Sequence, residues 1–158
     1  ANTERELYHI FVKNNYAAVR VAGSGMMENA DCDIIAGKKG KKFAIEVKSC
    51  KKLPKYISKD QINRFMTFSD IFGLKPVLGI RINQIGWIFL NPKNMVDSGK
   101  NWVINSEIIR KKGKRFAQFF KDKLIKKTQQ SLKGIGDINL NEKEIDDLIG
   151  AYHPDNLN

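Results

Sequence analysis

Two acids and a lysine, Asp33, Glu46 and Lys48, are the residues of this chain whose types and spacing could do chemistry. Apolar side chains alternate along residues 43–47, which predicts a strand. The apolar side chains would face one side of a sheet, and Glu46 and Lys48 the other. Charged side chains on a buried strand are costly unless they are paired or hold a metal. The pattern therefore indicates either a functional site or a strand face that is open to solvent.

Asp33 begins a short apolar run, residues 33–36, that precedes the strand. A hairpin through residues 37–40 would bring Asp33 beside Glu46 and form an oxygen-rich pocket with Lys48 at its rim. Mg²⁺ is usually held by one or two carboxylates, water and substrate phosphate, and such a site suits phosphodiester hydrolysis. We expect Mg²⁺, with Mn²⁺ as the alternative. By itself this D…ExK pattern of metal-dependent nucleases is weak, because it also arises by chance in basic proteins.

The composition favours a polyanionic partner. The 158 residues include 28 Lys and Arg against 17 Asp and Glu, a net charge of +11. Such an excess suits nucleic acid first and an anionic membrane second. There is no apolar run long enough to span a bilayer and no recognisable signal peptide. Cys32 and Cys50 lack metal-ligand spacing, and we expect Cys32 to face the core. We therefore expect an intracellular, cytoplasmic and nucleoid-associated protein.

The elements that must position these residues follow from periodicity and capping signals. Thr3 and Glu6 form a capping box that would begin a first helix, and Ser58 with Gln61 a second box. Gly73 would end the second helix. We expect strands at residues 16–22, 33–36, 43–47, 75–82 and 86–90, and a short edge strand at 102–104. The predicted order α-β-β-β-α-β-β indicates an α/β fold with a mixed sheet flanked by helices.

Short motifs follow one another along the first two thirds of the chain: Glu4-Arg-Glu-Leu7, Ala18-Val-Arg20, Gly23-Ser-Gly25, Asp33-Ile-Ile-Ala-Gly37, Ala44-Ile-Glu-Val-Lys-Ser49, Tyr56-Ile-Ser-Lys-Asp-Gln61, Phe72-Gly73 and Gly86-Trp87. Each motif alone is only weakly specific, but the ordered set is more specific. From residue 1 to 106 the chain resembles the archaeal Holliday junction resolvases of the restriction-endonuclease-like superfamily. The resemblance implies that fold.

The same resemblance implies roles for individual residues. Glu4, Asp33 and Glu46 would be the metal acids, and Lys48 would stabilise the transition state. Ser24 matches a serine that the family places close to the scissile phosphate, which makes it a further catalytic candidate. Two arginines match residues that the family uses on DNA: Arg5 and Arg20.

The family's activity implies a homodimer that binds four-way DNA junctions and nicks two opposing strands symmetrically. An isologous pair would place two identical sites on two equivalent strands. Recognition would rest on phosphates and branch geometry, with little contact to base edges. Two other functions stay open: a different structure-selective or repair nuclease of the same fold, and a DNA-binding protein that does no chemistry.

Several of these residues have a simpler explanation. Glu4 could do no more than stabilise a helix N-terminus. Gln61 could be no more than a capping side chain, although in the superfamily that the chain resembles a polar residue at this position often abuts the site. Asp31 and Glu28 are rival metal acids, although the apolar run after Asp33 favours Asp33. Other simple explanations are a flexible-loop role for Ser24 and surface positions for His9 and His153.

The predicted second helix carries more apolar residues than one core contact requires. Ile62, Phe65, Met66 and Phe72 form one stripe, and Phe68 and Ile71 add a flank. The helix is either wholly buried or part of a dimer face. The resemblance favours the dimer, with Phe68 and Phe72 as contacts.

Basic residues cluster around the predicted hairpin and after Lys48, and we expect them to bind DNA although charge runs are often only solvated: Lys38, Lys39, Lys41, Lys42, Lys51, Lys52 and Lys55. We divide the chain into a nuclease domain, residues 1–109, and a charged extension, 110–158. Residues 110–133 hold ten Lys and Arg against one acid, and 134–158 hold six acids against one Lys. Both parts of the extension are predicted to be helical. At the other end of the chain, the family that it resembles usually has a basic arm before the first helix.

Overall fold

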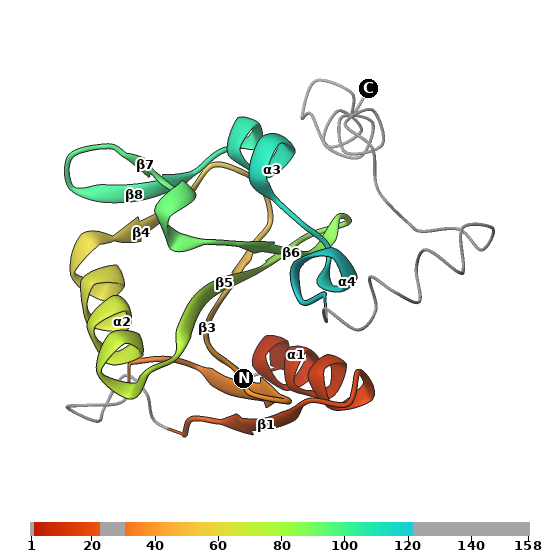
Figure 1. Cartoon of the computed structure of the whole chain (residues 1–158). Coiled ribbons are helices and arrows are strands. Elements are labelled where there is room, and N and C mark those ends of the chain that lie inside the picture. The colour runs from red at the N-terminus through yellow and green to blue at the C-terminus, as the bar shows by residue number, and fades with distance from the viewer. Residues whose placement is uncertain (1, 23–30, 122–158) are drawn as a thin grey trace.

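A computed structural model describes residues 2–22 and 31–121 of the chain (Figure 1). Its helices are α1 Asn2–Lys13, α2 Lys59–Phe72, α3 Ser106–Lys112 and α4 Phe116–Phe119, with a short 3-10 helix η1 at Pro92–Asn94. Its strands are β1 Ala17–Arg20, β2 Ile34–Lys38, β3 Lys41–Cys50, β4 Lys55–Ser58, β5 Lys75–Ile82, β6 Gly86–Leu90, β7 Val96–Asp97 and β8 Asn101–Ile104. Among these helices, none is long and apolar enough to cross a membrane.

The strands form two sheets. The five-stranded sheet has the order β1-β2-β3-β5-β6, and the small sheet has the order β4-β8-β7. Only β3 and β5 pair in parallel, while every other described pair is antiparallel. The predicted mixed sheet with flanking helices is therefore confirmed, and β3 lies at its centre.

The two faces of the large sheet bury separate clusters of apolar side chains. Phe43 and Ile45 of β3 pack on one face with Leu7 of α1, whereas Ala44 packs on the other face with Phe65 of α2. Figure 1 shows α1 and α2 on either side of β3 and β5. This alternation was predicted from the sequence, and it directs the even-numbered side chains of β3 toward α2.

Helix α1 approaches the sheet closely at Gly79 of β5. A Cβ atom at Gly79 would lie 3.1 Å from Leu7 Cδ2 and 3.4 Å from side-chain atoms of Ile45 and Phe89. Side chains leave little room at that distance, so glycine lets α1 settle on the strand. The contact fixes the first turn of α1, and with it Glu4, relative to the sheet.

Helix α2 has the ends that the sequence predicts. The Ser58 hydroxyl accepts a hydrogen bond from the Gln61 backbone N–H at 3.2 Å, and Gly73 ends the helix with a φ of 77°, which favours glycine. The predicted capping boxes are wrong in detail. The Gln61 side chain turns to Glu46, and Thr3 lies inside α1, which begins at Asn2.

The small sheet departs from the predicted order of elements. Strands β4 and β7 were not predicted because four and two residues contain too little alternation to stand out. Strand β8 was predicted as an edge strand, but it lies between β4 and β7. Helix α3 was also missed, although Asn105 caps it by accepting a hydrogen bond from the Ile108 N–H.

The start of the predicted extension packs on the domain. Ile109 is fully buried, and Lys114 exchanges two backbone hydrogen bonds with Phe89. Phe116 and Phe120 join the aromatic cluster beneath α1. Residues 110–121 therefore pack against the nuclease domain. The rest of the extension, with the acidic segment, lies outside the described residues.

Candidate active site

The hairpin of β2 and β3 brings Asp33 beside Glu46. The Asp33 backbone N–H donates to the Ile45 carbonyl at 3.0 Å, and the Asp33 carboxylate accepts from the Val47 N–H at 2.7 Å. Because Asp33 immediately precedes β2 and Glu46 lies in the middle of β3, antiparallel pairing places the two acids together. The structure thus has the hairpin geometry that the sequence predicts.

Glu46 is held by two side chains. Its Oε1 lies 2.9 Å from the Lys48 ammonium and accepts a hydrogen bond from Gln61 Nε2 at 2.7 Å. The Glu46 side chain is only 7% exposed and that of Lys48 19%. Lys48 follows Glu46 by two residues on one strand face, and Gln61 reaches them from the first turn of α2. The carboxylate is therefore oriented from both the sheet and the helix.

These side chains line one polar hollow of about 210 Å³, which we call the acid hollow. Its lining is Glu4, Asp31, Cys32, Asp33, Glu46, Val47, Lys48, Gln61 and Arg64. The lining includes all three predicted metal acids. Glu4 reaches it from α1 and lies 3.4 Å from Arg20 Nη2 on β1.

Negative charge is concentrated in the acid hollow. Burial raises the pKa of the Glu46 carboxyl, and the neighbouring Asp33 raises it further against the opposing effects of Lys48 and Gln61. Burial and the charges of Asp33, Glu46 and Asp31 raise the pKa of the Cys32 thiol to about 12. Cys32 is fully buried, as predicted, and stays a neutral thiol. A cation in the hollow would relieve the repulsion between the acids.

The donor chemistry fits a hard divalent cation. Within residues 2–22 and 31–121, no three acidic, histidine or cysteine side chains converge into a ready metal cage. Two adjacent carboxylates, Asp33 and Glu46, nevertheless match the one or two acids with which Mg²⁺ is usually held beside water and phosphate. The carboxylate of Glu4 is directed to Arg20 in this structure. Asp33 and Glu46 therefore carry the fit, and Glu4 as a third metal acid stays a prediction.

Not every predicted site residue belongs to the acid hollow. Ser24 and the rival acid Glu28 fall outside the described residues. The other rival acid, Asp31, lines the acid hollow and forms an ion pair with Arg64 at 3.3 Å. His9 is exposed on the surface, as predicted, and His153 lies outside the described residues.

Arg64 is a residue of the acid hollow that sequence reasoning missed. It follows Gln61 by three residues, and residues at that spacing lie on the same face of a helix. Once Gln61 is a candidate, this spacing is the signal that could have indicated Arg64. The Asp31 partner could not have been inferred in this way, because it depends on how α2 packs over the segment before β2.

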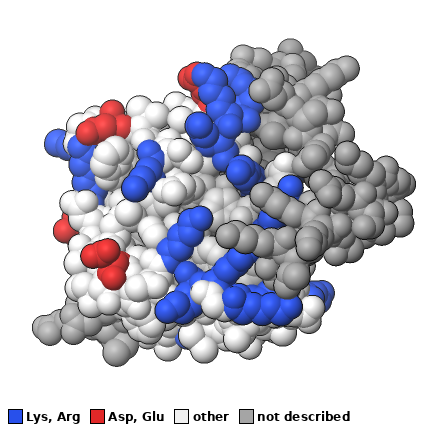
Figure 2. Space-filling model, in the orientation of Figure 1, with Lys and Arg blue, Asp and Glu red and all other residues white. Residues whose placement is uncertain are grey.

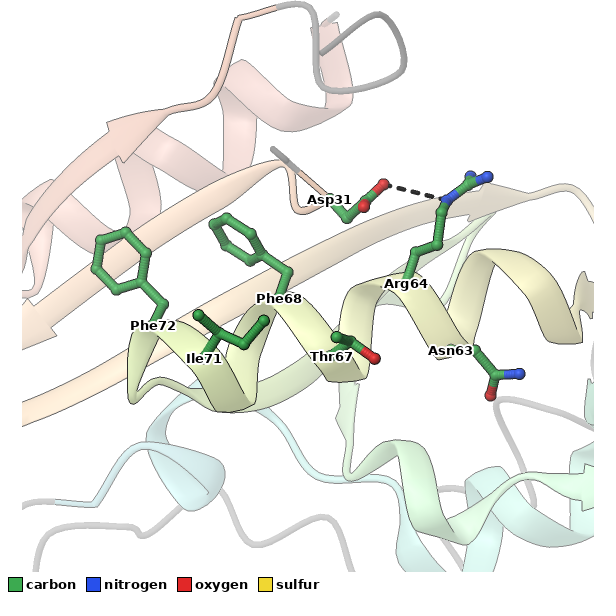
Figure 3. Close-up of a pocket in the computed structure, with 7 residues that line it drawn as sticks. All are labelled: Asp31, Asn63, Arg64, Thr67, Phe68, Ile71 and Phe72. Atoms are coloured by element: carbon green, nitrogen blue, oxygen red, sulfur yellow. Dashed lines mark ion pairs between the residues drawn. The ribbon is translucent and has the colours of Figure 1, made fainter. Parts of the chain in front are cut away.

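A second hollow, which we call the α2 groove, lies beside the first. It has a volume of about 610 Å³ and is lined by Asp31, Asn63, Arg64, Thr67, Phe68, Ile71 and Phe72. Figure 3 shows Arg64, Phe68 and Phe72 in one row of α2 and Asn63, Thr67 and Ile71 in the next. Ile71 is 81% exposed and Phe72 57%. The alternative that α2 is wholly buried is therefore wrong.

The predicted DNA-binding residues occupy several surfaces. Arg5 and Arg20 are exposed and line a shallow hollow between α1 and β1. The hairpin lysines lie at the other end of β2 from Asp33, roughly 16 Å away at 3.3 Å per residue. Lys38 and Lys41 donate to backbone carbonyls of Asn14 and Lys121.

None of the seven predicted DNA-binding lysines lines the acid hollow among the residues described. On the face in Figure 2, Lys and Arg side chains form a broken band from α3 toward α1, with few acids between them.

The chain matches the sequence model of one protein family over residues 1–129, described as archaeal Holliday junction resolvase (Hjc). It is 40% identical over 105 residues to crossover junction endodeoxyribonuclease Hjc of Methanocaldococcus jannaschii, covering 66% of this chain and 74% of that protein. It is 34% identical over 128 residues to the protein of the same name from Archaeoglobus fulgidus, covering 77% of this chain and 94% of that protein.

A solved structure is also similar. The 1.6 Å structure of Archaeoglobus fulgidus Hjc, described as a Holliday junction resolvase from an archaeal hyperthermophile, superposes with a TM-score of 0.70 at 33% identity. The match covers 75% of this chain and 95% of that one. The sequence match and the structural match thus lead to the same group of proteins.

Proposed function

This chain belongs to the archaeal Holliday junction resolvase family, and on that premise we propose that it binds four-way DNA junctions and nicks two opposing strands symmetrically near the branch point by metal-dependent phosphodiester hydrolysis. The fold is the restriction-endonuclease-like fold expected from the sequence. The observation that carries the proposal is the meeting of Asp33, Glu46 and Lys48 in one polar hollow.

The roles of the residues follow from their contacts. Asp33 and Glu46 would hold Mg²⁺, or Mn²⁺ in its place, because both carboxylates line the hollow and the pairing of β2 with β3 sets the two residues side by side. A bound divalent cation lowers the pKa of a water molecule and neutralises charge on the attacked phosphate. Val47 orients Asp33 through its N–H, and Gln61 orients Glu46 through its side-chain amide. These bonds restrict both acids before substrate arrives.

Lys48 would act on the reacting phosphate. Its ammonium lies at the hollow, 2.9 Å from Glu46, and is partly shielded from water. A cation in such a place stabilises charge that develops on phosphate oxygens in the transition state. Glu4 would be a third metal acid after turning from Arg20, and Ser24 would lie near the scissile phosphate.

Two copies of the chain would pair through the α2 groove. Phe68 and Phe72, with the strongly exposed Ile71, form an apolar surface that water disfavours. A two-fold dimer would place two acid hollows on two equivalent strands of a junction.

Branched DNA would bind through phosphate contacts from the basic surface. The net charge of +11 suits a polyanion. The predicted contacts are Arg5, Arg20, Lys38, Lys39, Lys41, Lys42, Lys51, Lys52 and Lys55. Work on chromosomal DNA would place the protein inside the cell, with the nucleoid.

The test is cleavage of an immobile four-way junction beside a linear duplex of the same arms, with Mg²⁺, by wild type and Glu46→Ala. We expect paired nicks in opposing strands near the branch, lost in the variant. Preference for flaps or nicked duplex would indicate another structure-selective nuclease. Binding without cutting by both proteins would leave a DNA-binding protein without chemistry.

A further inference from the structure

The acid hollow contains more negative than positive groups. Among the described residues of its lining, four are acids, and only Lys48 and Arg64 are cations. Lys48 is held against Glu46, beside the reacting centre. A DNA strand would add further negative phosphates to this surface. Among the described residues of the lining, Arg64 is therefore the cation that is left to hold the strand at the hollow.

Arg64 is well placed for that task. It lies one turn after Gln61 on α2 and its side chain is 55% exposed, so that it remains accessible to a strand entering the hollow. Its guanidinium contacts Asp31 through Nε at 3.3 Å and Asp60 through Nη1 at 2.8 Å. A guanidinium has five N–H donors in a planar fork, which matches two phosphate oxygens as well as it matches a carboxylate.

We propose that Arg64 is a phosphate-binding residue of the cleavage site, and that its guanidinium exchanges Asp31 for a phosphate of the strand that is cut. The inference rests on the proposed function, because it assumes a DNA strand at the acid hollow. The Arg64 side chain of this pair is 55% exposed and that of Asp31 20%, so the guanidinium stays accessible to a strand while it is paired. Asp31 would keep the guanidinium oriented at the hollow until DNA binds.

The position of Arg64 suggests one competing role. Arg64 also lines the α2 groove, and Figure 3 shows its ion pair with Asp31 at one end of that groove. It could therefore act in the contact between two copies and not on DNA. The oligomeric state must be measured together with DNA binding to separate these roles.

The first experiment compares binding of a four-way junction without divalent metal. Arg64→Ala should weaken binding by about 10- to 100-fold, the loss expected for one charge-assisted contact. Arg64→Lys keeps the charge but lacks the planar guanidinium, and it should recover part of the binding that Arg64→Ala loses. Lys59→Ala is the matched control, because it removes one charge from an ion pair with Asp97 at the start of α2, and Lys59 does not line the acid hollow. It should change binding by only about twofold.

The partner of Arg64 gives a variant with the opposite expected effect. Asp31→Asn removes the carboxylate that competes with phosphate, so metal-free junction binding should tighten. The gain should vanish in the double variant Asp31→Asn/Arg64→Ala. A gain of equal size in the presence and absence of Arg64 would contradict the exchange.

The second experiment locates the contact on the DNA. Neutral methylphosphonates are placed one at a time on the strand that is cut, around the nick position. For wild type, one replacement should weaken binding in the way that Arg64→Ala does. For Arg64→Ala, that same replacement should cost nothing more, while the other replacements keep their effects.

Three outcomes would overturn the proposed role of Arg64. Unchanged binding by Arg64→Ala, or effects that add at every phosphate, would overturn it. Loss of dimers in Arg64→Ala at concentrations where wild type is dimeric would assign Arg64 to the contact between copies and also overturn it. The proposed function fails separately, if wild type itself neither binds nor nicks the junction.

Discussion

The two hollows beside α2 share Asp31 and Arg64 but differ in almost every other respect. The acid hollow is small and polar, and its central carboxylate, Glu46, is nearly buried and held by two side chains. The α2 groove is larger and mainly apolar, and Ile71 within it is 81% exposed. One hollow holds charge in place, whereas the other leaves apolar surface in water.

The comparison shows how one helix serves two tasks. The first turns of α2 carry Gln61 and Arg64, which reach the acid hollow, and its last turns carry Phe68, Ile71 and Phe72, which line the groove. Polar contacts that orient a charge are needed where chemistry occurs, and exposed apolar surface indicates a partner. Substitutions at the two ends of α2 should therefore have separable effects.

The largest effect is expected at the centre of the acid hollow. Glu46→Gln keeps the size of the side chain but removes the charge that would hold the metal. Loss of several kcal/mol of transition-state stabilisation should lower the cleavage rate at least about 10³-fold. The rate is measured on a four-way junction with Mg²⁺ under single-turnover conditions.

The same Glu46→Gln variant should leave the groove intact. Its sedimentation behaviour should match wild type, and it should still bind the junction without metal. If Glu46→Gln still cut at more than a tenth of the wild-type rate, Glu46 would not be a metal ligand that cleavage requires.

The next largest effect is expected at the groove. Ile71→Glu puts a charge where a second copy would pack, so the dimer dissociation constant should rise at least about 30-fold, as for loss of one central contact. Analytical ultracentrifugation over a range of concentrations measures it. Val12→Glu is the matched control, since Val12 is an exposed apolar residue of α1 outside the groove. Equal effects of the two substitutions would exclude the groove as the dimer contact.

A smaller effect is expected where α2 touches the acid hollow. Gln61→Ala removes the hydrogen bond to Glu46 and should lower metal affinity or cleavage about 10- to 100-fold, as for other groups that orient a metal ligand. Ser58→Ala is the control, because it removes the cap of the same helix but no group of the hollow. It should cost about 1 kcal/mol of stability, with cleavage close to wild type. If Gln61 had only a structural role, Gln61→Ala would lower stability and leave cleavage close to wild type.

The smallest effect is a pH dependence of stability. Because the Glu46 pKa is raised in the folded protein, the native state keeps a proton that the unfolded chain has lost at pH values between the ordinary and the raised pKa. Stability contributed by this group is therefore present below its ordinary pKa and is lost as the pH rises through the raised one. The melting temperature of metal-free wild type should fall relative to Glu46→Gln over this interval. Adding Mg²⁺ should reduce the difference, because the cation binds the deprotonated acid.

The acid hollow was partly predictable because some of its geometry is local. The alternation of β3 and the short turn before it are enough to bring Asp33 beside Glu46 and Lys48. The ends of α2 were predictable for the same reason, since Ser58 and Gly73 act within one turn of the helix.

The parts that were missed depend on packing between distant segments. The Gln61 side chain can donate to Glu46, instead of capping its own helix, only after α2 has packed on the sheet. The Asp31–Arg64 ion pair requires the same packing. The strands β4 and β7 are too short to show a period and are stable only because β8 lies between them. Residues 110–121 looked like part of a charged tail, yet Phe120 is buried in the core.

The most direct test of the account uses mixed dimers that contain one wild-type and one Glu46→Ala subunit, purified through two different tags. Each subunit should carry a complete acid hollow, and the α2 groove should hold the two together. Mixed dimers should therefore nick one strand of a four-way junction, while wild-type dimers nick two opposing strands. Paired nicks by the mixed dimer, or no nicks at all, would contradict the account.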